Sequence, residues 1–247
     1  MDLSQPQYIY IGLAALIVGF TKTSVGGVGI LAILLMALAF PGKASPGVIL
    51  PMLLFADILA VMYYHRECQW NILFKIFPLT AVGVIIGYFT VDHIPTDIFE
   101  KVLGIIILAM LSLEFYLSKK NNQTSPKTSS SWLTISVIGI MAGIATMIAN
   151  AAGPIFGIYL LQMGLTKKEF VGTRSWFFLI LNIFKIPFSA SLGLITVETL
   201  KLDLMFVPVI LLGAFLGYKV LSLINIKVFK WFIRLAVLIA SIRLIMF

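Results

Sequence analysis

The stretch GFTKTSVGGVG at residues 19–29 interrupts a long hydrophobic block with glycines and small polar residues. A second stretch, GIATMIANAAGP at residues 143–154, interrupts another hydrophobic block 124 positions later. Helices broken at matching points of two membrane repeats indicate the binding site of a transporter. The two stretches therefore predict a repeated membrane fold with a site near the breaks.

Composition predicts an integral, multi-pass membrane protein. Of the 247 residues, 60% are hydrophobic and only 11% are charged, and the mean hydropathy is +1.06. A soluble domain carries about 25% charged residues. The chain is long enough for about six to eight crossings of about 20 residues each. No soluble domain fits in the remainder, so nucleotide-driven pumping would need a separate subunit.

Charge and cysteine content narrow the function further. The net charge of +8 comes from Lys and Arg residues spread through short loops and segment ends. That pattern is typical of topology signals, so we expect no nucleic-acid partner. Cys68 is the single cysteine, which leaves no intramolecular disulfide and no cysteine metal cluster. The N-terminus lacks the features of a cleaved signal peptide, so the first block is expected to be retained.

The hydrophobic blocks fall into two halves. The polar residues 119–131 have no hydrophobic period and predict a flexible linker between a first repeat, 1–118, and a second repeat, 132–247. The blocks of the two halves are 8–40, 46–64, 72–91 and 99–117, then 132–164, 173–195, 204–221 and 229–247.

A set of matching residues supports the repeat. Glycine and proline are common in membrane helices, which is the alternative explanation, but the coincidence of spacing favours a repeat. Each Gly-x-x-x-Gly pair would also let neighbouring helices approach closely. At a shift of 130 positions, Pro78, Gly83, Gly87 and Tyr88 match Pro208, Gly213, Gly217 and Tyr218.

The first block of each half is too long for one crossing of about 20 residues and too short for two. A re-entrant or broken helix hairpin fits this length. Hairpins also place most basic loop residues on one side, as the positive-inside rule requires, whereas full crossings divide them almost evenly. Three true crossings would follow each hairpin, so the second repeat would be inverted. Both termini would then be periplasmic and the linker cytoplasmic.

Several charged residues inside the hydrophobic blocks are candidates for function, because a charge within a membrane is expensive. Lys22 is the only charge in its block and lies too deep to snorkel easily. Asp57 could take a proton or pair with a lysine, and is our candidate for ion coupling. Asn182 and Lys185 lie on one face of the sixth block at i and i+3. Arg174 either joins the site or anchors the interface.

The polar groups of the breaks predict a small cavity for an anion. Backbone amides at the start of a half-helix can hold an anion, and the basic residues outnumber the one intramembrane acid. No catalytic motif or metal-ligand spacing occurs, so we expect no enzyme, no metal and no cofactor. The binding residues predicted from the breaks are Thr21, Thr23, Ser24, Gly27, Thr146, Asn150 and Gly153.

The chain resembles the TauE/SafE (sulfite exporter) family over essentially its whole length. The resemblance rests on three features: the opening segments at 19–27 and 150–154, the run from Leu50 through Asp57 to Trp70, and the closing Pro…Gly-x-x-x-Gly-Tyr pair. It implies a secondary exporter of a small sulfur-containing anion, such as sulfite or sulfoacetate, in the bacterial inner membrane. The second break has Ala145 or Thr146 in place of Lys22, so a symmetric two-lysine site is not expected.

Two other functions stay open from the sequence. An anion channel would differ from a carrier in throughput and coupling, and a membrane sensor or assembly factor would transport nothing. The identity of the anion, the coupling ion, the direction of transport and assembly into a homo-oligomer are also left open.

Overall fold

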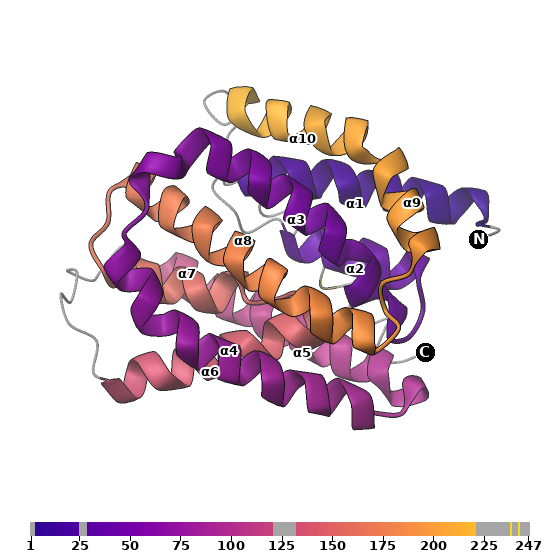
Figure 1. Ribbon diagram of the computed structural model, residues 1–247, viewed down its shortest axis with the longest axis horizontal. Coiled ribbons are helices and arrows are strands. Elements are labelled where there is room, and N and C mark those ends of the chain that lie inside the picture. The colour runs from indigo at the N-terminus through magenta and orange to yellow at the C-terminus, as the bar shows by residue number, and fades with distance from the viewer. Residues whose placement is uncertain (1–2, 25–28, 121–131, 221–237, 239–241, 243–247) are drawn as a thin grey trace.

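The computed structural model describes residues 3–24, 29–120, 132–220, 238 and 242, and all regular structure among them is helical (Figure 1). The prediction of an all-α fold is confirmed. Most of the linker at 119–131 and the last predicted block at 229–247 lie outside this description. The helices are α1 (Gln5–Thr23), α2 (Gly29–Ala39), α3 (Ala44–Tyr64), the 3-10 helix η1 (His65–Glu67), α4 (Trp70–His93), α5 (Thr96–Lys120), α6 (Trp132–Ala149), α7 (Gly153–Leu161), α8 (Lys167–Ser191), α9 (Val197–Met205) and α10 (Val207–Val220).

Three described helical segments are long and apolar enough to cross a membrane: Ala44–Glu67, Trp70–His93 and Trp132–Ala149. The pair α9–α10, bent by 49°, would add a fourth. This count covers the described residues alone, so the expectation of six to eight crossings for the whole chain stays a prediction.

Each interrupted stretch separates two helices, as predicted. In the first block α1 has 19 residues and α2 has 11, and in the second α6 has 18 and α7 has 9. The arms are therefore unequal, rather than two similar half-helices. In the first block the Gln7 amide donates to the carbonyl of Ala39 at 2.8 Å, which ties the start of α1 to the end of α2. These two arms form an antiparallel hairpin.

The glycine-bearing helix of each half packs against the interrupted block of the other half (Figure 1). A Cβ added to Gly213 of α10 would lie 2.1 Å from the carbonyl oxygen of Leu16 in α1. A Cβ added to Gly83 of α4 would lie 2.2 Å from the carbonyl oxygen of Ile140 in α6. Only glycine permits this approach. The two contacts correspond to each other in the two halves. Gly83 and Gly213 are 130 positions apart, and Leu16 and Ile140 are 124 positions apart, which are the shifts found in the sequence.

Helix α8 packs against α3, α4 and α7 and lies between the two interrupted blocks (Figure 1). Its first turn is fixed by a capping box, in which the Thr166 hydroxyl accepts from the Glu169 amide and the Glu169 carboxylate accepts from the Thr166 amide at 2.9 Å. Arg174, Asn182 and Lys185 follow on its buried side. Because 11 residues span about three turns, α8 reaches both breaks.

Candidate functional site

Arg174 binds the end of α1, where the first break begins. Its guanidinium donates to the carbonyl oxygens of Thr21, at 3.2 Å, and Ser24, at 2.8 Å. The last carbonyls of a helix lack partners within the helix and carry partial negative charge, so a cation is favourable there. Arg174 is buried. It therefore belongs to the polar network at the first break.

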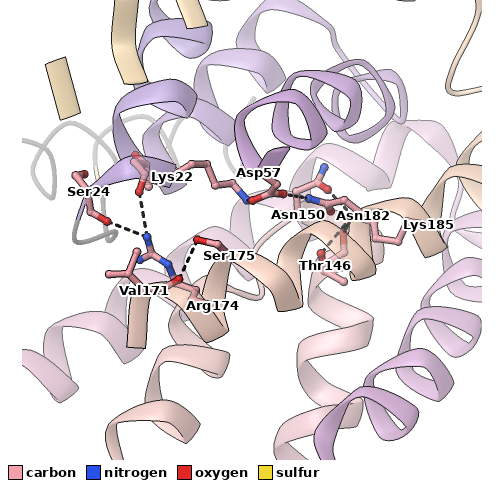
Figure 2. A network of polar contacts seen from close by, with 11 residues as sticks. Lys22, Ser24, Asp57, Thr146, Asn150, Val171, Arg174, Ser175, Asn182 and Lys185 are labelled. Carbon is pink, nitrogen blue, oxygen red and sulfur yellow. Dashed lines mark hydrogen bonds and ion pairs between the residues drawn. The ribbon is translucent and has the colours of Figure 1, made fainter. Parts of the chain in front are cut away.

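Asp57 of α3 lies at the centre of the polar network and is fully buried (Figure 2). One carboxylate oxygen is 2.7 Å from the Lys22 ammonium, and the other accepts from the Asn182 side chain at 2.7 Å. The Lys22 ammonium also lies 4.5 Å from the centre of the Phe178 ring, a cation–π contact. Asp57 thus joins the first break to α3 and α8.

Lys185 binds the second break. Its ammonium donates to the Thr146 carbonyl at 2.8 Å, to the Thr146 hydroxyl at 3.2 Å, and to the side-chain oxygen of Asn150. Lys185 is 1% exposed. Asn150 adopts a left-handed backbone with φ of 52°, which asparagine tolerates better than most residues. Its amide nitrogen donates to the carbonyl of Pro46 at 2.8 Å, which fixes the turn against α3.

The charges in this network are unevenly compensated. Lys22 has a carboxylate partner, whereas the partners of Lys185 among the described residues are all uncharged oxygens. A buried charge is stable only when it is paired or fully hydrogen-bonded. The second break therefore holds a buried ammonium with no carboxylate among its described hydrogen-bond partners.

Two of the predicted residues, Thr23 and Gly153, lie apart from this network. The Thr23 hydroxyl donates to the carbonyl of Ala214 at 2.9 Å, so it holds α10 against α1. Gly153 begins α7, and a Cβ there would meet no atom within 4 Å. Gly27 lies outside the described residues. Thr21 and Ser24 contribute carbonyl oxygens, where hydroxyl groups were expected.

Sequence reasoning missed the backbone acceptors and the ring of Phe178. Carbonyl groups have no residue signature, and an aromatic residue in a membrane helix is unremarkable in sequence. Over the part of the chain that the structure describes, no group of three or more His, Cys, Asp or Glu residues could hold a metal ion.

Apolar helices around a buried charged network, with two of the blocks interrupted, indicate a multi-pass membrane protein. A family model described as "Sulfite exporter TauE/SafE" matches residues 11–244, and the chain belongs to that family. The resemblance inferred from the sequence motifs is confirmed. The family consists of transporters and not enzymes, in agreement with the expectation from the motifs. The comparisons with curated proteins and with solved structures gave no match.

Proposed function

We propose that this protein is a secondary transporter that exports a small sulfur-containing anion, such as sulfite, sulfoacetate or a related sulfonate, across the inner membrane. The observation that carries this proposal is the buried ammonium of Lys185 at the second break, held by uncharged oxygens alone among the described residues. An ammonium has three N–H donors. An arriving anion can accept one of these hydrogen bonds in place of Thr146 or Asn150.

The start of α7 supplies the second part of the proposed anion site. This helix begins at Gly153, three residues after Asn150, and a Cβ added to Gly153 would have no atom within 4 Å. The first amides of a helix point outward and carry partial positive charge, which favours an anion. Pro154 has no N–H and the Phe156 amide donates to the Ala152 carbonyl, so a sulfonate or sulfite oxygen would be held between the Lys185 ammonium and the amides of Gly153 and Ile155.

We further propose that the two halves are inverted repeats whose interrupted blocks enter and leave by the same side. The corresponding contacts of Gly83 with Ile140 and Gly213 with Leu16 support a two-fold relation. Both termini would be periplasmic and the linker cytoplasmic, with alternating access produced by rocking one repeat against the other.

Labelling of introduced cysteines tests this topology. The native Cys68 is first replaced by serine, although burial raises the pKa of its thiol to about 11 and slows its reaction at neutral pH. A cysteine at Lys127 should then react with a membrane-impermeant maleimide only from the cytoplasmic side. Reaction from the periplasmic side would contradict the proposed orientation.

Transport by purified protein in liposomes tests the function. Wild type should exchange ³⁵S-labelled sulfite or sulfoacetate, and Lys185→Met should lose that exchange. The matched control is Lys201→Met, because Lys201 is exposed on α9. Equal exchange by wild type and Lys185→Met would remove Lys185 from the site. Large unitary currents in planar bilayers would indicate a channel instead, and no flux of any anion would indicate a sensor or assembly factor.

A further inference from the structure

Asp203 is a buried carboxyl group that the anion site does not use. It lies in the last turn of α9 and is 5% exposed. Neither of its carboxyl oxygens has a hydrogen-bond partner among the described residues. Asp57 differs in this respect, since its carboxylate binds both Lys22 and Asn182. The two aspartates within the helical bundle therefore have opposite surroundings.

Asp203 lines a pocket of about 180 Å³ between α3, α9 and α10, and the other side chains around it are apolar. The charged groups of the packed helices point elsewhere. On α3, Asp57 binds Lys22 and Asn182. On α9, Glu198 and Lys201 are exposed, and on α10, Lys219 is exposed near the far end. The other lining residues are Pro51, Met52, Leu54, Phe55, Ile58, Leu204, Val207 and Ile210.

An ionised carboxylate in such a pocket would lack both water and a counter-ion. Burial without a partner strongly disfavours the charged form of a carboxyl group and favours the protonated form. Within a span that faces lipid, this preference is stronger still, and ionisable groups there often belong to proton pathways. The geometry therefore indicates a carboxyl group that binds a proton.

The corresponding helix of the first half shows that this feature belongs to the second half alone. At the shift of 130 positions, Asp203 corresponds to Leu73, which is fully buried in α4. Helix α4 continues through Pro78, whereas the chain bends by 49° between α9 and α10, next to Pro208. Proline alone does not produce the bend, because both helices have it. The carboxyl group lies one turn before the bend, where a change in its charge would act on the helix geometry.

We propose that Asp203 is a proton-binding site and that its proton is the ion coupled to anion transport. This coupling role rests on the proposed function. While the pocket is closed, the carboxyl group holds its proton. Its O–H bond breaks when the α9–α10 bend opens the pocket to water, the proton leaves to that water, and the carboxylate takes a proton from the opposite side before the pocket closes.

Infrared spectroscopy tests proton binding without any transport. Purified wild type at neutral pH should show the carbonyl stretch of a protonated carboxylic acid, shifted in D₂O, and Asp203→Asn should lack that band. Glu198→Gln is the matched control on the same helix and should retain it. Absence of the band in wild type, or its persistence in Asp203→Asn, would overturn the assignment.

Transport driven by a pH gradient tests the coupling. The probe is labelled sulfoacetate, whose sulfonate stays ionised, and gradients of both directions are imposed on liposomes. The membrane potential is held at zero by valinomycin with equal K⁺ on both sides, because sulfoacetate with one proton still carries net charge. One pH unit and a tenfold concentration ratio then represent the same free energy, so a carrier that couples one proton accumulates the anion about tenfold. Asp203→Asn should exchange the anion at the wild-type rate and accumulate none, whereas Glu198→Gln should match wild type.

The remaining outcomes contradict the coupling role. Accumulation of the anion by Asp203→Asn would assign the proton to another group. So would a loss of accumulation in Asp57→Asn when Asp203→Asn still accumulates the anion. Loss of both exchange and accumulation in a folded Asp203→Asn protein would indicate a general structural role. If wild type exchanges no anion, the proposed function fails and the coupling falls with it, while the infrared band still decides whether Asp203 binds a proton.

Discussion

The two helix breaks carry the same charge from different sources. Lys22 belongs to the first break itself, and the matching position in the second break, Thr146, is neutral. In the structure the Lys185 ammonium of α8 donates to Thr146, so each break is in contact with one lysine ammonium. The sequence predicted no symmetric two-lysine site, because the second break has no lysine of its own, and in the structure a lysine of α8 contacts that break. What differs is the compensation, because Asp57 pairs with Lys22 and uncharged oxygens surround Lys185.

Helix α8 explains how one element serves both breaks. Arg174 binds the final carbonyls of α1, and Lys185 binds those of α6, about three turns further along. Asn182 lies between them and holds Asp57. A displacement of α8 along its axis would therefore change both breaks at once, which is a direct physical route for coupling the two halves.

The largest effect is expected at the first break, where Lys22 has a carboxylate partner. Lys22→Met leaves the Asp57 carboxylate buried without its counter-ion, and such changes destabilise proteins by about 3–5 kcal/mol. The double variant Lys22→Met/Asp57→Asn should recover most of the loss, because neither member of the ion pair is left buried without the other. Thermal unfolding in detergent, followed by tryptophan fluorescence, measures both. Equal destabilisation of the single and double variants would show that the ion pair does not hold the first break.

Removal of the lysine at the second break, where Lys185 binds uncharged oxygens among the described residues, should have a smaller effect on stability. Lys185→Met leaves behind only a carbonyl, a hydroxyl and an amide oxygen, whose lost hydrogen bonds cost about 1–3 kcal/mol. The protein should therefore unfold at a higher temperature than Lys22→Met, although anion exchange is abolished. A Lys185→Met protein less stable than Lys22→Met would reverse our ranking of the two breaks.

Much of this site could be predicted from residue type and depth in the membrane. Charges in apolar blocks are rare, so Lys22, Asp57, Arg174 and Lys185 were recognisable, and the structure brings them into one network. The pairings were not predictable, because they join helices far apart in sequence and use backbone carbonyls. Asp203 was missed because it adjoins the start of a hydrophobic block, where an acid is typical of a segment end.

The fold was predictable to a similar extent. Repeated glycines and prolines indicated the two halves, and the helix breaks occur where glycine and asparagine interrupt the apolar blocks. The unequal lengths of the arms were not predictable, since hydropathy does not record where a helix ends. The direction of Thr23 toward α10 depends on the close approach permitted by Gly217, which only the packed structure reveals.

The turn at Asn150 provides a smaller test of the second break. Asn150→Ala loses the side-chain bonds to Lys185 and Pro46 and also strains a backbone with positive φ. Asn150→Gly loses the same bonds without that strain, so it should be more stable by about 1 kcal/mol. The comparison of their unfolding temperatures isolates the backbone contribution. Equal temperatures would show that the turn relaxes when the side-chain bonds are lost.

The smallest expected effect concerns a single acceptor of Lys185. Thr146→Val keeps the shape of the side chain and the carbonyl bond but removes the hydroxyl, which costs about 0.5–1.5 kcal/mol. The ammonium then has a donor that only an incoming anion can satisfy. Anion affinity should therefore rise while stability falls, as measured by the upward shift of the unfolding temperature with added sulfite. Thr134→Val removes a hydroxyl at the outer end of the same helix and should leave that shift unchanged. A lower affinity in Thr146→Val would mean that the hydroxyl itself binds the anion.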